Sequence, residues 1–364
     1  MVNRKNKFLI FQIICVIIFL YKYIPFFQAQ NIWYDDAHEL LISKISISDF
    51  KSFSSVADHH LGFSLYLKII LNFFGQEHIY LLLGFLNLSL FLIINFFLSK
   101  QNNFPLEIIA VQIFILMSPI VVDYMYRPKQ YFIDFCIAVC LIYYFSKDKN
   151  IKFNKILPLL LITSFFSNIL IIYFFVPLLK LILRSKDRLL IFSSLLLVVP
   201  FFYKSYNKFF NTSFREYWFI YYENSFQSFS KLFFNNLMFL RNFNDLGLLP
   251  LIIVMTLFGL YRVYKENLNA FWMILIPVIV LNFLNLVNFY PIGAGRTDLI
   301  LFPFIVYSFL YLIKFVSTKI PIVYLLIFLL PVFFVVENKK VVSIDKFLFQ
   351  HIFMLKNSSR YVKH

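Results

Sequence analysis

Carboxylates at the edges of apolar runs are the residues of this chain that could do chemistry. Asp35 and Asp36 follow the first apolar run closely, and Asp134 lies one turn into a later run. A carboxylate in such a position can act as a general base toward a hydroxyl or ligate a divalent cation. The same residues could equally be solvated helix caps or halves of structural ion pairs. The residues alone leave both interpretations open.

Basic and amide side chains stand beside these acids. Arg127 and Lys129 precede the run that contains Asp134, and Arg296 opens a late run. Their donors suit phosphate oxygens, and either Arg127 or Lys129 could supply the partner that a deep carboxylate such as Asp134 needs. Gln130 is four residues before Asp134, so the two share one helix face.

A second group of residues could hold a metal ion or a lipid headgroup. Asp58, His59 and His60 lie between the first and second apolar runs, as does Glu39. Adjacent histidines on a helix point to different faces, so the pair alone is a weak metal signal. A divalent ion held together with Asp36 or Glu39 is one hypothesis, and solvated surface residues are the other.

Composition decides which elements must position these residues. The 364 residues are 61% hydrophobic and only 14% charged, whereas soluble domains carry about 25% charged residues. Because about 20 apolar residues cross a bilayer as a helix, we predict an all-α polytopic transmembrane bundle of about ten or eleven spans. The predicted spans are 8–27, 77–98, 105–122, 131–146, 156–167, 169–183, 189–203, 245–261, 270–289, 298–315 and 320–336.

The basic residues predict how these spans are oriented. Short breaks rich in Lys and Arg alternate with longer breaks, as the positive-inside rule expects of cytoplasmic loops. The alternation holds only if 156–183 forms two helices that meet near Ser167-Asn168, rather than one long helix. The N-terminus is then cytoplasmic, in a bacterial inner (plasma) membrane. The segments predicted on the opposite side are 28–76, 123–130, 204–244, 290–297 and the tail from 337.

All candidate site residues then fall on one non-cytoplasmic side. We expect one membrane domain over 1–336, which includes the outer loop 28–76, and a short non-cytoplasmic tail over 337–364. Within the outer loop, 60–75 is predicted to form a short helix that either lies along the membrane interface or packs against the bundle. The net charge of +16 fits basic loops and attraction to anionic lipids. No basic stripe of the kind that binds nucleic acid is present, so no nucleic-acid partner is expected.

The ordered motifs resemble the GT-C superfamily of membrane glycosyltransferases, in the protein mannosyltransferase and lipid A aminoarabinose transferase branch (glycosyltransferase family 39). WYDDAHE follows the first span where that family has a D-E-A pattern, and HHLGFSLYLKIILNFFG is similar to its H-P-P-L stretch. KQYFID is close to a K-Q-Y-x-x-D pattern, and GAGRTDLILFPF has the Gly-Arg that opens a late span. The chain departs from the family where Asp36 replaces Glu and where the H-P-P-L prolines are absent.

The resemblance implies an inverting transferase that moves a sugar from a polyprenyl phosphate to an acceptor hydroxyl on the non-cytoplasmic side. Asp35 looks like the general base, with Asp36 and Asp134 as further catalytic carboxylates. The donor phosphate would be held by Arg127, Lys129, Gln130, Tyr131 and Arg296. A divalent metal ion could take part, whereas no nucleotide cofactor is expected because no G-x-G-x-x-G motif occurs. The acceptor could be a protein, a lipid or a glycan.

Two other functions share these features. A flippase for lipid-linked sugars would also have many spans, but it should carry polar residues near the bilayer midplane, whereas the acids here cluster at the outer boundary. A polymerase or ligase of lipid-linked glycans would differ only in its donor. The transferase hypothesis requires Asp35 and Asp134 to approach one outer cavity.

Overall fold

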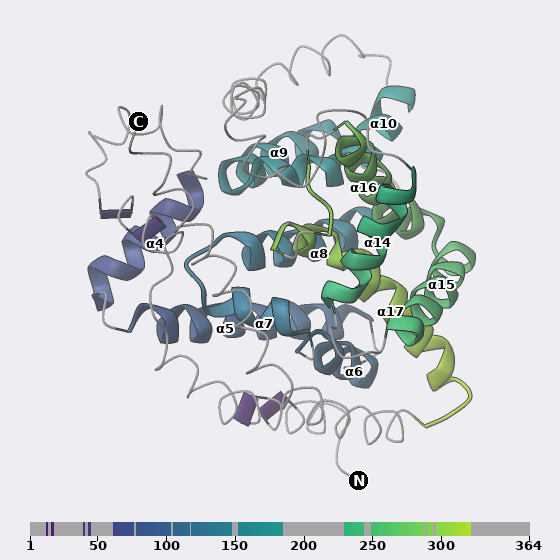
Figure 1. Cartoon of the computed structure of the whole chain (residues 1–364), viewed down its shortest axis with the longest axis horizontal. Helices are drawn as coiled ribbons and strands as arrows, with labels where there is room; N and C mark the ends of the chain where they lie inside the picture. Colours follow the sequence, from purple (N-terminus) through teal and green to yellow (C-terminus); the bar gives the residue numbers. More distant parts are fainter. Residues whose placement is uncertain are drawn as a thin grey trace, which may run out of the picture.

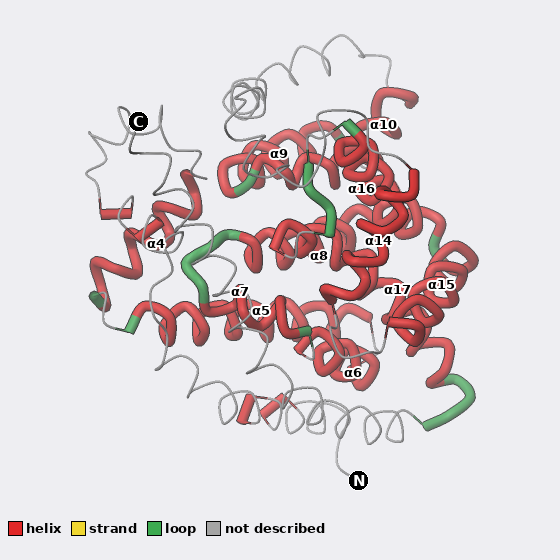
Figure 2. The backbone as a smooth tube through the Cα atoms, in the orientation of Figure 1, coloured by secondary structure: helices red, strands yellow, loops and turns green. Residues whose placement is uncertain are grey.

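A computed structural model describes residues 12–13, 16–17, 39–40, 43–44, 61–75, 78–102, 105–116, 118–147, 152–184, 229–243, 249–287, 290–293 and 296–321. Over these residues every regular element is a helix (Figure 1), and no strand is present among them (Figure 2). The all-α prediction is therefore confirmed for the described part. The predicted span 189–203, and nearly all of 8–27 and 320–336, lie outside the described residues.

Among the described residues, three helical stretches are long and apolar enough to cross a membrane. They are Ile79–Ser99 in α5 (Ile79–Asn102), Leu268–Leu286, which is α16, and Thr297–Ser317, which joins η3 (Arg296–Leu301) to α17 (Phe302–Ser317). Each coincides with a predicted span, because a long apolar run must satisfy its backbone within a helix when no water is near. These helices are the expected elements of a membrane protein.

The predicted span 105–122 differs in the structure, where it is broken. Helix α6 covers Pro105–Leu116 and α7 covers Pro119–Tyr126, and the two are bent by 81°. Pro119 has no backbone N–H, and Ser118 before it is extended with φ −76° and ψ 111°, as a residue before proline prefers. The segment 123–130 is consequently half helical rather than a loop.

The run over 156–183 forms two helices, as the charge pattern predicts. Helix α9 (Phe153–Phe166) ends at Ser167, whose φ of −159° and ψ of 126° are extended. The chain resumes as the 3-10 helix η1 (Asn168–Phe174) and continues as α10 (Phe175–Arg184). Ser167 is fully buried at the break, and its N–H still donates to Thr163 O at 2.8 Å.

Helices α15 (Leu249–Glu266) and α17 lie side by side and run in the same direction, with α16 returning between them in the chain. Gly259 of α15 packs against Ser308 of α17, and further along both helices Glu266 forms an ion pair with Lys314, so the two helices are parallel. Asn267 alone separates α15 from α16, and its side chain accepts a hydrogen bond from Ala270 N–H. A further helix, α14 (Phe229–Phe243), lies within 204–244, where the sequence predicted only an outer segment.

The short helix predicted over 60–75 is present as α4 (Leu61–Phe74). It packs against α5 and α9 through a buried face that includes Phe63, Leu67 and Ile70. Ile69 and Phe73 are exposed on the side away from that face, and Phe74 is exposed at the end of the helix. Both faces are apolar, so α4 needs the bundle on one side and a second apolar environment on the other.

Helix α8 (Tyr131–Lys147) lies in the middle of the described helices (Figure 1). Tyr307 on α17 donates a hydrogen bond of 2.9 Å to Val139 O of α8. Aromatic rings fill the neighbouring space, with Phe114 of α6 at 3.8 Å from Phe309 and 4.9 Å from Phe243, measured between ring centroids. Rings of this size dominate the burial of apolar surface. Helix α8 itself packs against η1 and η3.

Candidate functional site

Asp134 is the most unusual polar residue in the described part of the chain. It lies in the first turn of α8, where its N–H donates to Gln130 O at 2.9 Å, and it is 2% exposed. Ser167 of the α9–η1 break lies within interaction range, but neither Asp134 Oδ1 nor Ser167 Oγ makes a hydrogen bond with the described residues. Leaving a buried acceptor unpaired is costly, which is characteristic of binding and catalytic groups.

The prediction that Arg127 or Lys129 is the ion-pair partner of Asp134 is wrong. Arg127 Nε donates to Asp123 Oδ2 at 2.8 Å, and Tyr126 Oη donates to Asp123 Oδ1 at 2.6 Å. The i,i+4 spacing of Asp123 and Arg127 is the signal that sequence reasoning missed. Because α7 continues as a helix to Tyr126, Asp123 lies one turn before Arg127 and is the acid that forms its ion pair.

Lys129 and Glu39 form an ion pair that brings two predicted site residues together. Lys129 Nζ lies 3.2 Å from Glu39 Oε1, with side chains 12% and 11% exposed. The two residues are 90 positions apart in the chain. A partly buried pair of this kind fixes the two segments relative to each other, because separating it leaves a charge poorly solvated. The first predicted outer segment therefore reaches the turn before α8, at least at Glu39.

The chain before η3 is organised around Asp298, which is fully buried. Its carboxylate accepts hydrogen bonds from Gly293 N–H at 2.8 Å and from Asn242 Nδ2 of α14 at 2.7 Å. Asn242 Nδ2 also donates to Gly293 O at 3.1 Å. Gly293 has φ +83°, a conformation that favours glycine, and its backbone packs against Asn235 of α14. Asp298 is thus a structural acid that holds the segment from which Arg296 begins η3.

Tyr290 connects this segment to Asp134. Burial, then the nearby Tyr131, Asp298 and Asp134 side chains, and last Tyr173, raise the pKa of the Tyr290 phenol well above its ordinary value. Tyr290 Oη donates to Thr297 O at 2.8 Å, while Tyr173 Oη of η1 donates to Ile300 O of η3. The start of α8, η1 and the segment leading into η3 therefore converge on Asp134.

Aromatic side chains flank the turn before α8. Tyr131 meets Tyr124 of α7 edge to face, with ring centroids 5.2 Å apart and planes at 84°. Arg127 lies 5.8 Å from the Tyr124 ring centroid and is itself 7% exposed. Gln130 is partly exposed and caps the first turn of α8 through its carbonyl. Together these residues make a polar turn with aromatic walls.

A small apolar hollow of about 40 Å³ lies along α8, and its lining begins at Phe135, the residue after Asp134. It lies between α5, α6, α8 and α17, and residues that line it include Phe135, Cys136, Val139, Phe91, Val111 and Tyr307. Asn95 contributes one of its few polar groups, and the lining is otherwise almost entirely apolar. Such a space suits an apolar chain rather than a sugar.

The remaining predicted site residues are only partly tested. Asp35, Asp36, Asp58, His59 and His60 lie outside the described residues, so the predicted approach of Asp35 to Asp134 stays a prediction. Arg296 is the first residue of η3, and its side chain is not described. Within the described ranges, no group of three His, Cys, Asp or Glu could hold a metal ion. The metal hypothesis depends on Asp36, Asp58, His59 and His60, which lie outside those ranges, and it stays a hypothesis.

No family model, no curated protein and no solved structure matches this chain. Its function has to be inferred from the arrangement of its own residues. At the start of α8 that arrangement combines a buried carboxylate with an unpaired oxygen, a basic turn and an apolar hollow. These three features match the parts of an amphiphile that carries an anionic group and hydroxyls above an apolar chain.

Proposed function

We propose that this protein is a polytopic membrane glycosyltransferase of GT-C type that uses a polyprenyl-phosphate sugar as donor. The observation that carries the proposal is Asp134, a buried acid with an unpaired oxygen between the Lys129 turn and the apolar hollow. The prenyl chain would lie against the apolar lining that begins at Phe135, and the phosphate would lie at the turn. The sugar would lie against Asp134. The order of motifs along the chain, described above, supports the same assignment.

Contacts between distant segments support the proposed orientation in the membrane. Residues that meet come from the same predicted side in each case. On the non-cytoplasmic side the pairs are Glu39 with Lys129, Asn242 with Asp298, and Tyr173 with Ile300. On the cytoplasmic side they are Lys180 with Asn269 and Lys314 with Glu266. A contact between residues from opposite predicted sides would have contradicted the orientation that the basic breaks predict. We retain about ten or eleven spans and a cytoplasmic N-terminus.

The proposed reaction is an inverting displacement at the anomeric carbon. Asp35 takes the proton of the acceptor hydroxyl while the acceptor oxygen forms the new glycosidic bond. The bond between the anomeric carbon and the phosphate oxygen breaks, and polyprenyl phosphate leaves with the electron pair. Lys129 uses part of its donor capacity on Glu39, and its remaining N–H groups, with Arg296, would stabilise the leaving phosphate. Asp134 would accept a hydrogen bond from a sugar hydroxyl and thereby position the donor.

A pair of carboxylate variants tests this proposal. Asp134→Asn keeps the shape of the side chain but removes its charge, and Asp35→Asn removes the proposed base. A general base contributes about 10²–10⁴-fold, so Asp35→Asn should reduce turnover by about that factor. Glu107→Gln is the control, because Glu107 is an acid in the first turn of α6 that has no proposed part in the reaction.

The assay begins with lipid extracts of cells that lack the gene, analysed by mass spectrometry for an accumulated prenyl-phosphate sugar. The extracted lipid is then given to purified protein in detergent, and formation of a new glycosidic bond is measured. A lipid-linked sugar flippase would also cause accumulation but would form no bond in detergent. Full transfer activity in purified Asp35→Asn and Asp134→Asn protein, or no accumulated lipid in the deletion strain, would overturn the proposal.

A further inference from the structure

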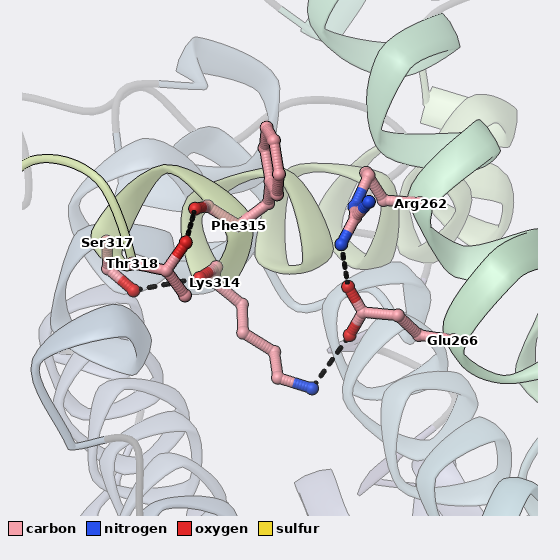
Figure 3. A network of polar contacts seen from close by, with 6 residues as sticks. All are labelled: Arg262, Glu266, Lys314, Phe315, Ser317 and Thr318. Carbon is pink, nitrogen blue, oxygen red and sulfur yellow. Dashed lines mark hydrogen bonds and ion pairs between the residues drawn. The ribbon is translucent and has the colours of Figure 1, made fainter.

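The end of the α15–α17 helix pair that lies away from Asp134 carries a shared carboxylate. Glu266 is the last residue of α15, and its two oxygens accept from Arg262 Nη2 at 2.7 Å and from Lys314 Nζ of α17 at 2.8 Å (Figure 3). Figure 3 also shows the Ser317 and Thr318 hydroxyls turned back onto the carbonyls of Lys314 and Phe315. Both helix ends are therefore held in one fixed arrangement.

This arrangement leaves an excess of positive charge. Glu266 is shared by two cations, so it neutralises only one of them. Lys265 and Lys319 are exposed and have no acidic partner among the described residues. We call Arg262, Lys265, Lys314 and Lys319, with Glu266, the α15–α17 cationic end. An uncompensated group of cations at one place attracts an anion.

Aromatic rings lie beside three of these cations, including Lys314, whose Nζ is 5.5 Å from the Tyr311 ring centroid. The Arg262 guanidinium lies 4.2 Å from the Phe315 ring centroid, and its Nε is buried without a hydrogen-bond partner. Lys265 Nζ lies 5.7 Å from the Tyr261 centroid and 5.9 Å from that of Tyr264. A cation that lies above an aromatic ring can bind a phosphate at the same time, because the ring does not occupy the hydrogen-bond donors of the cation.

An apolar stripe on α15 leads to this cationic end. Val254, Leu257, Phe258, Tyr261 and Tyr264 are each about half exposed or more, and they recur at helical spacing along one face. The stripe passes from aliphatic side chains to tyrosines and then to Lys265. The same order of polarity is found in one leaflet of a bilayer, from the acyl chains through the interface to the headgroups.

We propose that the α15–α17 cationic end binds an anionic glycerophospholipid, with its phosphate at Arg262, Lys265 and Lys314 and one acyl chain along the α15 stripe. Lys319 lies just beyond the end of α17 and adds to the attraction. The apolar stripe favours a lipid over a soluble phosphate, since a soluble anion would leave it uncovered. Glu266 keeps the two cations of different helices close enough to bind one phosphate. The inference rests on the membrane location proposed above, but not on sugar transfer.

Native mass spectrometry of the purified full chain, delipidated in a neutral detergent, tests the proposal. The probes are phosphatidylglycerol and phosphatidylcholine of the same acyl chains. We expect retained phosphatidylglycerol to exceed retained phosphatidylcholine at least fivefold. Each lysine near an anionic surface contributes about a fivefold factor in affinity, so Lys265→Gln should weaken phosphatidylglycerol binding about fivefold, and Lys265→Gln with Lys319→Gln about twenty-fivefold.

Lys152→Gln is the matched control, because it removes one exposed lysine near the start of α9, in another basic break. It should change phosphatidylglycerol binding by less than twofold. Equal binding of the two lipids, or an equal loss in the Lys152→Gln and Lys265→Gln proteins, would overturn the proposal. Folding of each variant is checked by its thermal unfolding without lipid. It should match that of the unaltered protein, because Lys152, Lys265 and Lys319 have no acidic partner to lose within the described ranges. Failure of the glycosyltransferase assay would leave these outcomes unchanged.

Discussion

Replacing Gly259 with alanine should destabilise the protein, although the same change stabilises most helices. A Cβ at position 259 would lie 2.9 Å from Ser308 Cα and closer still to the Ser308 carbonyl carbon and oxygen. Ordinary Cβ contacts are 3.4 Å or longer. All the atoms it meets are backbone, so no side chain can rotate away. Helices α15 and α17 would have to move apart over their whole contact.

The expected magnitude follows from two opposed effects. Helix propensity alone favours alanine over glycine by about 1 kcal/mol. Overpacking of a close contact costs about 1–3 kcal/mol, and more where backbone has to shift. The Ser308 contact is fully buried and rigid, so the packing term should be the larger one. We therefore expect a net loss of about 1–2 kcal/mol in the free energy of unfolding.

Thermal unfolding of the purified protein in one detergent measures this effect. Leu257→Ala is the control, since Leu257 is on the same helix, two residues away, and is 62% exposed. The Gly259→Ala protein should unfold several degrees below both the unaltered protein and this control. A Gly259→Ala protein as stable as the unaltered one, or more stable, would mean that α15 and α17 are not packed backbone to backbone.

Two further predictions concern ion pairs. Glu39→Gln and Lys129→Gln should each lower the free energy of unfolding, and the double variant should lose less stability than the sum of the two single losses. A double-mutant cycle by thermal unfolding should give a coupling energy of about 1–3 kcal/mol. Additive losses would contradict the pairing. Burial alone would raise the pKa of the Glu266 carboxyl, but hydrogen bonds and charge from Lys314 and Arg262 outweigh it and lower that pKa below its ordinary value. The stabilisation by Glu266 should therefore be complete above the ordinary glutamate pKa and disappear as the pH falls through the lowered one. In unfolding scans across that acidic range, the Glu266→Gln protein should lose less stability than the unaltered protein, and identical losses would contradict the prediction.

The sequence determined where most helices of the described part lie. The runs 77–98, 131–146 and 270–289 correspond closely to α5, α8 and α16, because a long apolar stretch bounded by charges has no other way to satisfy its backbone in lipid. Basic breaks also predicted that 156–183 is two helices, and Ser167 is extended between them. Asp134 was predicted in the first turn of a helical span, and the structure places it in the first turn of helix α8.

Local signals were missed where they competed with the hydropathy pattern. Pro119 breaks the apolar run 105–122, but the run is continuous in hydropathy, so a single span was predicted. Helix α14 was missed because its apolar residues are interleaved with polar ones within 204–244. The pair of Asp123 and Arg127 could have been predicted from its i,i+4 spacing.

The sequence by itself therefore determined most of the described helices, because hydropathy is a property of short segments. The side of a membrane on which each acid or base lies stays a prediction from the charges of the breaks. Only the tertiary structure decided which residues meet. Lys129 binds Glu39 rather than Asp134, Asp298 fastens the segment before η3, and the hollow lies beside Asp134. The physical reason is that each partner comes from a distant part of the chain. Its proximity depends on how helices pack, which no local pattern encodes.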